Sequence, residues 1–435
     1  MEKLGWHTLG TAFDCDCGER HALPIEACYL GEDADRRLAS FAHGRCGRTC
    51  LVVSDENTRA AAGEGLFSQL GMEGVRIAER IYPVGPLDAT GERADDVARE
   101  GEALDFYVSV GAGTLCDLAK YAASKQNKPF LAYPTAASMN GYTSAIAALK
   151  VGGLKRTLPC QPATGVFVDP EIAAGAPARM TAAGVADFLS KASSSADWRA
   201  AHLLRHVYFC PRAREFALEM QERVIARAPA IGRGDVEAVR LVLEALLLSG
   251  MGMVVAGSSA PASGGEHLIS HYIDMKDAID GTGHDLHGTQ VGVATVYALR
   301  LWERILAMRT TDIDPEGMVA AYPSSNTIRE RIYADWGGTV GDEVWRQWSE
   351  KALDEAGLRA ELESVRQHLP GLRGALLADL VPSETVARCI EEAGGPAEPA
   401  GLEVPPDAYH AALAGARFLR NRYTVLDLAA ALGLA

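Results

Sequence analysis

Several features that mark other protein classes are missing from this 435-residue sequence. It has no block rich in Lys or Arg, and 42 basic residues against 57 acidic ones give a net charge of −15. This balance argues against nucleic acid or an anionic membrane surface as a partner, although one basic pocket would still suit a small anion. The first residues, MEKLGWHTLGTAF, lack the apolar region of a signal peptide, and we see no stretch that approaches the roughly 20 apolar residues of a membrane span. We therefore expect a cytoplasmic protein that binds neither nucleic acid nor membrane.

The nine cysteines include no Cys-x-x-Cys pair and are scattered along the chain, so a disulfide framework is not expected. One local group stands out in the segment FDCDCGERH. Cys15, Cys17 and His21 could supply three soft ligands to a structural zinc, but a tetrahedral site takes four and the spacing matches no strong zinc pattern. The alternative is an irregular segment with a glycine turn and buried thiols. The sequence leaves both readings open.

The chain changes character near residue 180. Before it, short β-branched or aromatic runs alternate with helical stretches, at 49–56, 77–84, 105–113, 129–135 and 164–171. After it, apolar positions recur at helical spacing, as in 236–257 and 408–432, and the Pro- and Gly-rich stretch 394–407 is typical of a surface loop. This order predicts an α/β domain with a mostly parallel sheet over residues 1–180 and an all-α domain over residues 181–435.

Histidines gather in the second part of the chain. Four of the eleven lie within 21 residues, at His267, His271, His284 and His287. Two imidazoles four residues apart project from the same face of a helix, so His267 and His271 can reach one metal ion or one substrate. His202 and His206 have the same spacing without a second cluster downstream, which shows that such a pair also arises by chance. The second pair, with glycines that let the chain turn back, favours a metal centre for the first.

A glycine-rich turn follows one of the predicted strands. Residues 108–110 lead into GAGTLCDLAKYAASK, where Gly111 and Gly113 would let backbone N–H groups and a helix amino terminus approach a phosphate. A turn from strand to helix also takes glycine for steric reasons alone. Because Cys116 stands where a third glycine would fall, the segment is not the GxGxxG fingerprint of a regular Rossmann dinucleotide domain.

The next predicted strand ends in YPTAASMNGYTS. Thr135, Ser138 and Ser144 supply hydroxyl groups that should lie at the carboxyl edge of the sheet, where ligands bind in open α/β proteins. A Ser- and Thr-rich turn followed by a hairpin would explain the same residues.

Six segments occur in a recognisable order: SDENT (54–58), VGAGTLCDLAKYAA (110–123), PTAASMNGYTS (134–144), GVADFLSK (184–191), SSAPASGGEHLISH (258–271) and LHGTQVGV (286–293). Together they resemble the glycerol-1-phosphate dehydrogenase family, a branch of the iron-containing alcohol dehydrogenase and dehydroquinate synthase-like superfamily. The resemblance covers roughly residues 20–300, and RFLRNRYTVLDLA (417–429) is similar to the tail of the bacterial members.

The resemblance implies a Rossmann-like α/β domain that binds NAD or NADP, followed by a helical metal-binding domain, with metal and substrate in the cleft between them. The residues that it assigns to the cofactor pyrophosphate are Gly111, Ala112, Gly113, Thr114 and Leu115. Thr135, Ser138 and Ser144 are expected to line the rest of the cofactor site. Asp55 is expected near the adenosine ribose.

The resemblance also assigns one divalent metal to Asp187, His267 and His287. His271 is then expected to face the substrate and the proton path, and His284 has no counterpart. One carboxylate and two imidazoles suit zinc, nickel or ferrous iron, and ligand type alone does not choose among them. In this motif Ala186 stands where the family usually has Gly.

The implied reaction interconverts dihydroxyacetone phosphate and sn-glycerol 1-phosphate by hydride transfer. Lys155 and Arg156 are candidates for a substrate phosphate pocket, and a solvated hairpin tip is the alternative. Asn140 is expected to contact the substrate at a position where the family usually carries Asp, so substrate preference can differ.

Two other functions fit parts of this pattern. A dehydroquinate synthase-like enzyme would retain NAD without net redox turnover, but it needs more Lys and Arg around its anionic substrate than these segments offer. A catalytically silent sensor of NAD or metal would not need the complete ligand set. A related polyol or alcohol dehydrogenase with another substrate remains the nearest alternative. We also expect a homo-oligomer, a dimer or larger.

Overall fold

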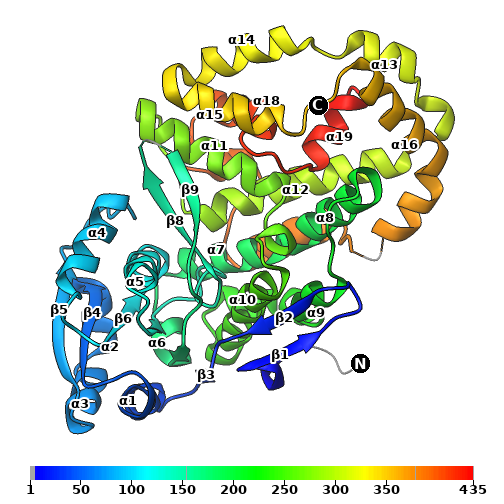
Figure 1. Ribbon diagram of the computed structural model, residues 1–435. Coiled ribbons are helices and arrows are strands. Elements are labelled where there is room, and N and C mark those ends of the chain that lie inside the picture. Colours follow the sequence, from blue (N-terminus) through cyan, green and yellow to red (C-terminus); the bar gives the residue numbers. More distant parts are fainter. Residues whose placement is uncertain (1–4, 153, 378, 435) are drawn as a thin grey trace. The chain divides into compact units, whose positions relative to one another are not determined.

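The computed structural model describes every residue except 1–4, 153, 378 and 435 (Figure 1). The chain forms two compact units. Unit 1 comprises Met1–Phe188, Cys210–Ser259 and Glu392–Gly395, and unit 2 comprises Leu189–Phe209, Ala260–Glu391 and Pro396–Ala435. By its contacts, residues 210–259 group with the amino-terminal part of the chain, whereas the sequence-based division at residue 180 put them in the second domain. The functions assigned to the two predicted domains stay predictions.

Unit 1 is built on a six-stranded, fully parallel sheet with the order β3-β10-β7-β6-β4-β5. Its strands are β3 (Ala27–Leu30), β4 (Thr49–Asp55), β5 (Arg76–Tyr82), β6 (Phe106–Gly111), β7 (Phe130–Pro134) and β10 (Gly165–Val168). Buried apolar runs such as TCLVVSD in β4 are typical of parallel strands that are covered on both faces. Five of these strands were predicted, and the α/β fold class is confirmed; the edge strand β3 was missed.

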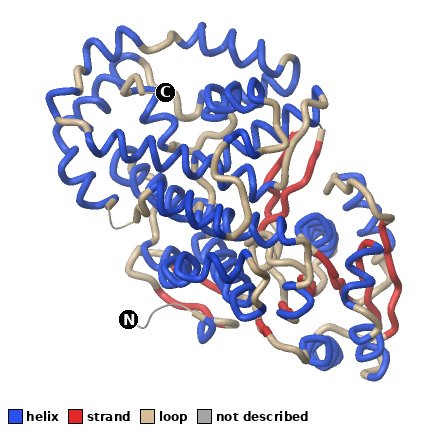
Figure 2. The backbone as a smooth tube through the Cα atoms, turned by 180° about the vertical axis from the view of Figure 1, so that it is seen from behind, coloured by secondary structure: helices blue, strands red, loops and turns tan. Residues whose placement is uncertain are grey.

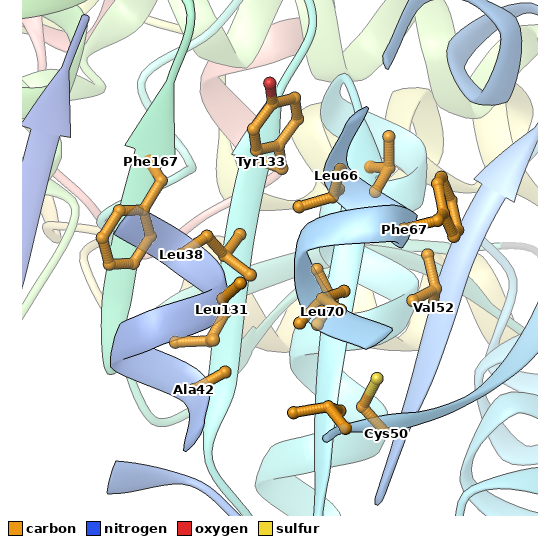
Figure 3. Packing of buried hydrophobic residues seen from close by; sticks show 14 of the residues in the cluster. Leu38, Ala42, Cys50, Val52, Leu66, Phe67, Leu70, Leu131, Tyr133 and Phe167 are labelled. Carbon is orange, nitrogen blue, oxygen red and sulfur yellow. The ribbon is translucent and has the colours of Figure 1, made fainter. Parts of the chain in front are cut away.

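One face of the sheet packs against α1 (Ala34–Arg45) and α3 (Gly65–Met72), as Figure 3 shows. Side chains from both helices interlock there with Val52 of β4, Leu131 of β7 and Phe167 of β10. The opposite face carries α4 (Gly91–Glu100) and α5 (Gly113–Lys125). The phenol of Tyr107 in β6 points to that side, where it donates to the carbonyl of Ala98 in α4 over 3.2 Å. Helices on both faces are the doubly wound arrangement in which ligands bind at the carboxyl edge.

Among the described residues, the remaining elements of unit 1 are two antiparallel hairpins, five α-helices and the 3-10 helix η1 (Trp6–Thr8). The hairpins are β1 (Thr11–Asp14) with β2 (Arg20–Leu23), and β8 (Ile146–Val151) with β9 (Leu154–Pro159). The helices are α2 (Glu56–Ala62), α6 (Pro170–Ala174), α7 (Ala178–Leu189, its last residue in unit 2), α9 (Pro211–Gly232) and α10 (Val236–Ala256).

The helix α10 corrects one expectation. It is long and apolar enough to cross a membrane, contrary to the expectation that no stretch of this chain comes near that length. However, 83% of its most apolar window is buried inside the protein, where it packs against α9 and α6. Asp235 caps its first turn and Gly257 ends it in the left-handed conformation, as is common at helix ends.

The described residues of unit 2 form helices and connecting loops, without a strand (Figure 2). Its α-helices are α8 (Lys191–Arg205), α11 (Gly265–Asp280), α12 (His287–Ala307), α13 (Pro315–Ala321), α14 (Ser325–Trp336), α15 (Gly338–Ser349), α16 (Glu355–Leu376), α17 (Ser383–Glu392, its last residue in unit 1), α18 (Pro406–Gly415) and α19 (Val425–Ala431). The pair α11 and α12 packs together, and the loop between them lets residues about 20 positions apart in the sequence meet.

Candidate active site

The predicted glycine turn lies at the carboxyl end of β6. Gly111 ends the strand with a φ of +150°, and a Cβ atom there would clash with the side chain of Leu115. The conformation therefore requires glycine, and any larger residue would also displace the Leu115 side chain. Ala112 is the N-cap of α5, and its methyl side chain cannot accept a hydrogen bond from the first amides of the helix. These N–H groups and the helix dipole are suited to a phosphate.

This turn flanks the topological switch point of the sheet. β4 lies between β5 and β6, so the chain leaves β4 toward one side and later returns to its other side. Asp55, the residue predicted to lie near the ribose, ends β4. Its carboxylate is already engaged in a structural hydrogen bond. Its Oδ1 accepts a hydrogen bond from the N–H of Thr58 over 2.7 Å, and the hydroxyl of Thr58 accepts from the N–H of Asp55 over 3.0 Å. This capping box starts α2, and the sequence DENT carried the signal for it.

The loop 135–145 lies beside the glycine turn. The N–H of Thr135 bonds to the carbonyl of Gly111 over 3.4 Å, and a Cβ on Gly113 would be 3.3 Å from the sulfur of Met139. Ser138 approaches the phenol of Tyr142 at 3.5 Å. The structure thus places Thr135 at the predicted turn, whereas the contact of Ser138 lies within the loop.

Ser144 differs from the other two, because its side chain is fully buried and donates inside the loop. Its hydroxyl lies 3.0 Å from the carbonyl of Gly141 and 3.2 Å from that of Ile146. Lys120 of α5, also fully buried, donates to the same two carbonyls. The ammonium lies 3.7 Å from a carboxylate oxygen of Asp117 one turn earlier. Ser144 and Lys120 therefore fix the shape of the loop, a role that sequence reasoning missed and that the D-x-x-K spacing within α5 could have indicated.

Asp187 and Asn140 meet in unit 1. The N–H of Asn140 donates to Oδ2 of Asp187 over 3.1 Å, and the Asp187 side chain is buried. The contact depends on a close approach of α7, because a side chain on Gly184 would collide with the carbonyl of Ala137. The predicted metal ligand and the predicted substrate contact are thus neighbours. The hydrogen bond that joins them comes from the backbone N–H of Asn140 and not from its side-chain amide.

Lys155 and Arg156 lie next to each other in β9. Neighbouring residues of a strand point to opposite faces, so the hairpin directs these two side chains apart. Lys155 is half-buried and Arg156 is exposed. A phosphate pocket that uses both side chains stays a prediction that this geometry does not favour.

Three of the clustered imidazoles lie together in unit 2. His267 and His271 are one turn apart on α11, and His287 is the first residue of α12. The ring centroids are 5.2 Å apart for His267 and His287, 5.7 Å for His271 and His287, and 6.2 Å for His267 and His271. The helix spacing and the turn before α12, both noted in the sequence, produce this arrangement.

Two of these rings are held through Nδ1. In His267 that atom lies 2.9 Å from Oε1 of Glu266, and in His287 it lies 2.9 Å from the hydroxyl of Ser270. Ser270 is held in turn by the amide of Gln290, which donates to its hydroxyl over 2.9 Å. A histidine whose Nδ1 is engaged in this way presents Nε2 to a metal in a fixed orientation.

The carboxylate behind His267 is buried and charged. Burial alone would raise the pKa of Glu266, but hydrogen bonds from His267, from the N–H of Gly264 and from Ser193 hold that pKa below its ordinary value. The neighbouring Asp197 behaves in the opposite way, because burial and the charge of Glu266 raise its pKa. The negative charge of this pair therefore lies on the residue that contacts the imidazole.

His284 lies outside this cluster. Its Nδ1 is 2.7 Å from Oδ2 of Asp277, and 45% of its side chain is exposed. This surface contact with Asp277 gives His284 a local role in the loop before α12, in line with its lack of a counterpart in the family.

Comparisons with known proteins decide the family. A family model for iron-containing alcohol dehydrogenases matches residues 29–177. A glycerol-1-phosphate dehydrogenase (NAD(P)+) of Thermococcus kodakarensis is 33% identical over 358 residues, which are 77% of this chain and 97% of that protein. One from Geobacillus stearothermophilus is 29% identical over 437 residues, which are 98% of each chain. The chain belongs to the glycerol-1-phosphate dehydrogenase family. The resemblance inferred from six short segments is thus confirmed.

Solved structures support the fold. The alcohol dehydrogenase of Oenococcus oeni superposes with a TM-score of 0.59 at 16% identity and covers 94% of this chain and 97% of its own. At that identity the likeness concerns the fold alone. It agrees with the predicted succession of an α/β part and a helical part.

Proposed function

We propose that this protein is a metal-dependent NAD(P) oxidoreductase that interconverts dihydroxyacetone phosphate and sn-glycerol 1-phosphate. The observation that carries the proposal is the fixed orientation of His267 and His287 by Glu266 and Ser270. Such anchoring is typical of imidazoles that bind a metal. The curated relatives, which bear the name of this activity, support the choice of substrate.

The cofactor is proposed to bind at the switch point beside β4 and β6. The amides that open α5 would hold its pyrophosphate, and Thr135 and Ser138 would line the adjoining part. Asp55 would reach the ribose only with the carboxylate oxygen that does not cap α2. Ser144 would act indirectly, since its buried hydroxyl supports the loop.

The metal is proposed to bind Asp187, His267 and His287. One carboxylate and two neutral imidazoles fit a divalent zinc, nickel or iron, and three protein ligands leave a position open for substrate. When bound, the ion supplies Lewis-acid stabilisation of the charge that develops on the substrate oxygen during hydride transfer. The anionic Glu266 keeps the proton of His267 on Nδ1, so that Nε2 retains its lone pair for the ion.

His271 is proposed to face the substrate. Its ring lies 5.7 Å from that of His287, close enough to exchange a proton with a hydroxyl held at the same centre. An imidazole is suited to this transfer near neutral pH because its ordinary pKa lies there. Asn140, tied to Asp187 through its backbone, would offer its side-chain amide to the substrate without carrying charge.

The test is an assay of NADH and NADPH oxidation with dihydroxyacetone phosphate beside a panel of plain and phosphorylated ketones. We expect net turnover that is fastest with the phosphorylated triose, that a chelator abolishes and that added metal restores. Tight NAD binding without net oxidation of NADH would contradict the proposal and favour a dehydroquinate synthase-like reaction. Faster turnover of an unphosphorylated ketone would instead keep the oxidoreductase and change its substrate, as Asn140 allows.

We also propose a cytoplasmic homo-oligomer, a dimer or larger. Light scattering of the purified protein at several concentrations measures the mass directly. A monomer at all concentrations would contradict the oligomer.

A further inference from the structure

Four metal-binding side chains meet at the turn end of the β1–β2 hairpin in unit 1. Cys15 and Cys17 lie in the turn between the strands, His21 lies on β2, and Cys210 is the N-cap of α9. One ligand atom from each, three sulfurs and one imidazole nitrogen, lies within 4.8 Å of all the others. Cys210 is separated from His21 by 189 positions in the chain, so only the fold brings the fourth side chain to the other three.

The distances match the edges of a tetrahedron around zinc. With Zn–S bonds of about 2.3 Å and Zn–N bonds of about 2.0–2.1 Å, tetrahedral angles place two sulfurs about 3.8 Å apart and a sulfur about 3.6 Å from the nitrogen. The sulfurs of Cys15 and Cys210 are 3.8 Å apart, and Nε2 of His21 is 3.5 Å from the sulfur of Cys210 and 3.2 Å from that of Cys17.

A disulfide does not explain this cluster, because a bonded pair of sulfurs is about 2.05 Å apart. Hydrogen bonding explains it poorly as well, since thiols are weak donors and weak acceptors. The imidazole and Cys210 are nevertheless buried, while Cys15 and Cys17 are half-buried. The donor set of three thiols and one imidazole is common in closed structural zinc sites.

The surrounding structure indicates that such an ion would stabilise the hairpin. A two-stranded hairpin is at best marginally stable alone, and most of β1 is exposed. Figure 1 shows the hairpin beside α9, the 22-residue helix that Cys210 opens. A bound ion would tie the hairpin to this helix.

We propose that Cys15, Cys17, His21 and Cys210 bind one zinc ion as a closed, structural site. Four protein ligands complete the tetrahedron and leave no position for a substrate, so the ion acts through stability alone. None of these residues belongs to the proposed active site. The second ion is therefore independent of the metal proposed for Asp187, His267 and His287, and of the proposed reaction.

The first experiment measures zinc per chain by mass spectrometry after dialysis, in the full-length protein and in two variants. Cys210→Ser is expected to lose one equivalent of zinc. Cys46→Ser, a change at a half-buried cysteine at the end of α1, is the matched control and should keep the parent content. Retention of all zinc in Cys210→Ser, or an equal loss in both variants, would overturn the proposal.

A second measurement does not depend on any variant that could fail to fold. X-ray absorption at the zinc edge of the unaltered protein, loaded with zinc, should show sulfur scatterers at about 2.3 Å beside nitrogen at about 2.0–2.1 Å. A shell made only of nitrogen and oxygen would overturn the proposal. So would a thiol titration of the denatured, unreduced protein that finds two fewer than nine thiols, since a disulfide would then occupy the cluster.

Discussion

Unit 2 contains two pairs of histidines with the same four-residue spacing and very different surroundings. His202 and His206 are both exposed, and the ring of His202 bonds to the carbonyl of Val207 over 2.8 Å. His206 ends α8 in the left-handed conformation, so it does not share a helical face with His202. His267 and His271 lie within α11, and a buried, charged carboxylate holds the first of them.

The contrast teaches that spacing alone does not make a metal site. What separates the pairs is the set of groups behind the rings: Glu266 for His267, and Ser270 with Gln290 for the third ring, His287. These partners fix which ring nitrogen faces outward, and a surface imidazole such as that of His202 has no comparable support. Substitutions at the rings, and then at the groups that hold them, test this difference.

The largest effect is expected for His287→Ala. Two remaining ligands hold a divalent ion poorly, and losing several kcal/mol of charge stabilisation should lower kcat/KM on the order of 1,000-fold. Metal content and turnover should fall together. His284→Ala, three residues away and tied to Asp277, is the control and should change neither. Full metal retention in His287→Ala would contradict its assignment as a ligand.

His271→Ala should separate the two roles within the helical pair. We expect the variant to keep its metal and to lose about 10²–10⁴-fold in kcat, as is typical when a group that transfers a proton is removed. The comparison of metal content with His287→Ala decides the matter. Equal metal loss in both variants would show that the division of roles is wrong.

Glu266→Gln should have a smaller effect that added metal reverses. The amide keeps the shape of the side chain but removes the charge that holds the Nδ1 proton of His267, so metal affinity should fall about 10–100-fold. Activity at saturating metal should return toward the parent value. Asp277→Asn is the matched control at the surface pair. Unchanged metal affinity in Glu266→Gln would remove the feature that we use to distinguish the two histidine pairs.

The smallest effect is expected for His202→Ala. Its ring lies at the surface, where it bonds to the carbonyl of Val207 and stacks on Phe209 with the ring centroids 5.6 Å apart. Neither contact involves the proposed metal site, so metal content and kcat/KM should stay within the error of the assay. The free energy of unfolding should change by no more than about 0.5 kcal/mol, as for most surface substitutions. Loss of metal in this variant would mean that spacing counts for more than the groups behind the rings.

The parallel sheet could be predicted because its strands carry their own signals. Continuous apolar runs such as 49–55 bury both faces, and Gly111 marks the turn after β6. The short strands β1, β2 and β3, of four residues each, were missed, and the alternation of exposed and buried residues in β2 becomes visible only in the fold. Their stability comes from tertiary pairing, which no local pattern records.

The candidate site was predictable to the same degree. The histidine cluster was predicted from two imidazoles four residues apart and a second histidine pair downstream. The family resemblance added Asp187 as a ligand. The supporting groups were not identified, although Glu266 and Ser270 lie inside the quoted segments, because burial and hydrogen bonding depend on the fold. The sequence could not predict that Cys210 joins the other three ligands. It lies 195 positions after Cys15, and a single sequence says nothing about such a distance in space.

The most direct test of the division among the three histidines is anomalous diffraction at the metal edge from crystals of the loaded protein. We expect one peak at the histidine cluster, bonded to Nε2 of His267 and Nε2 of His287, with Asp187 as the third protein ligand and the ring of His271 outside the coordination shell. A peak bonded to His267 and His271, with His287 outside the shell, would contradict this expectation.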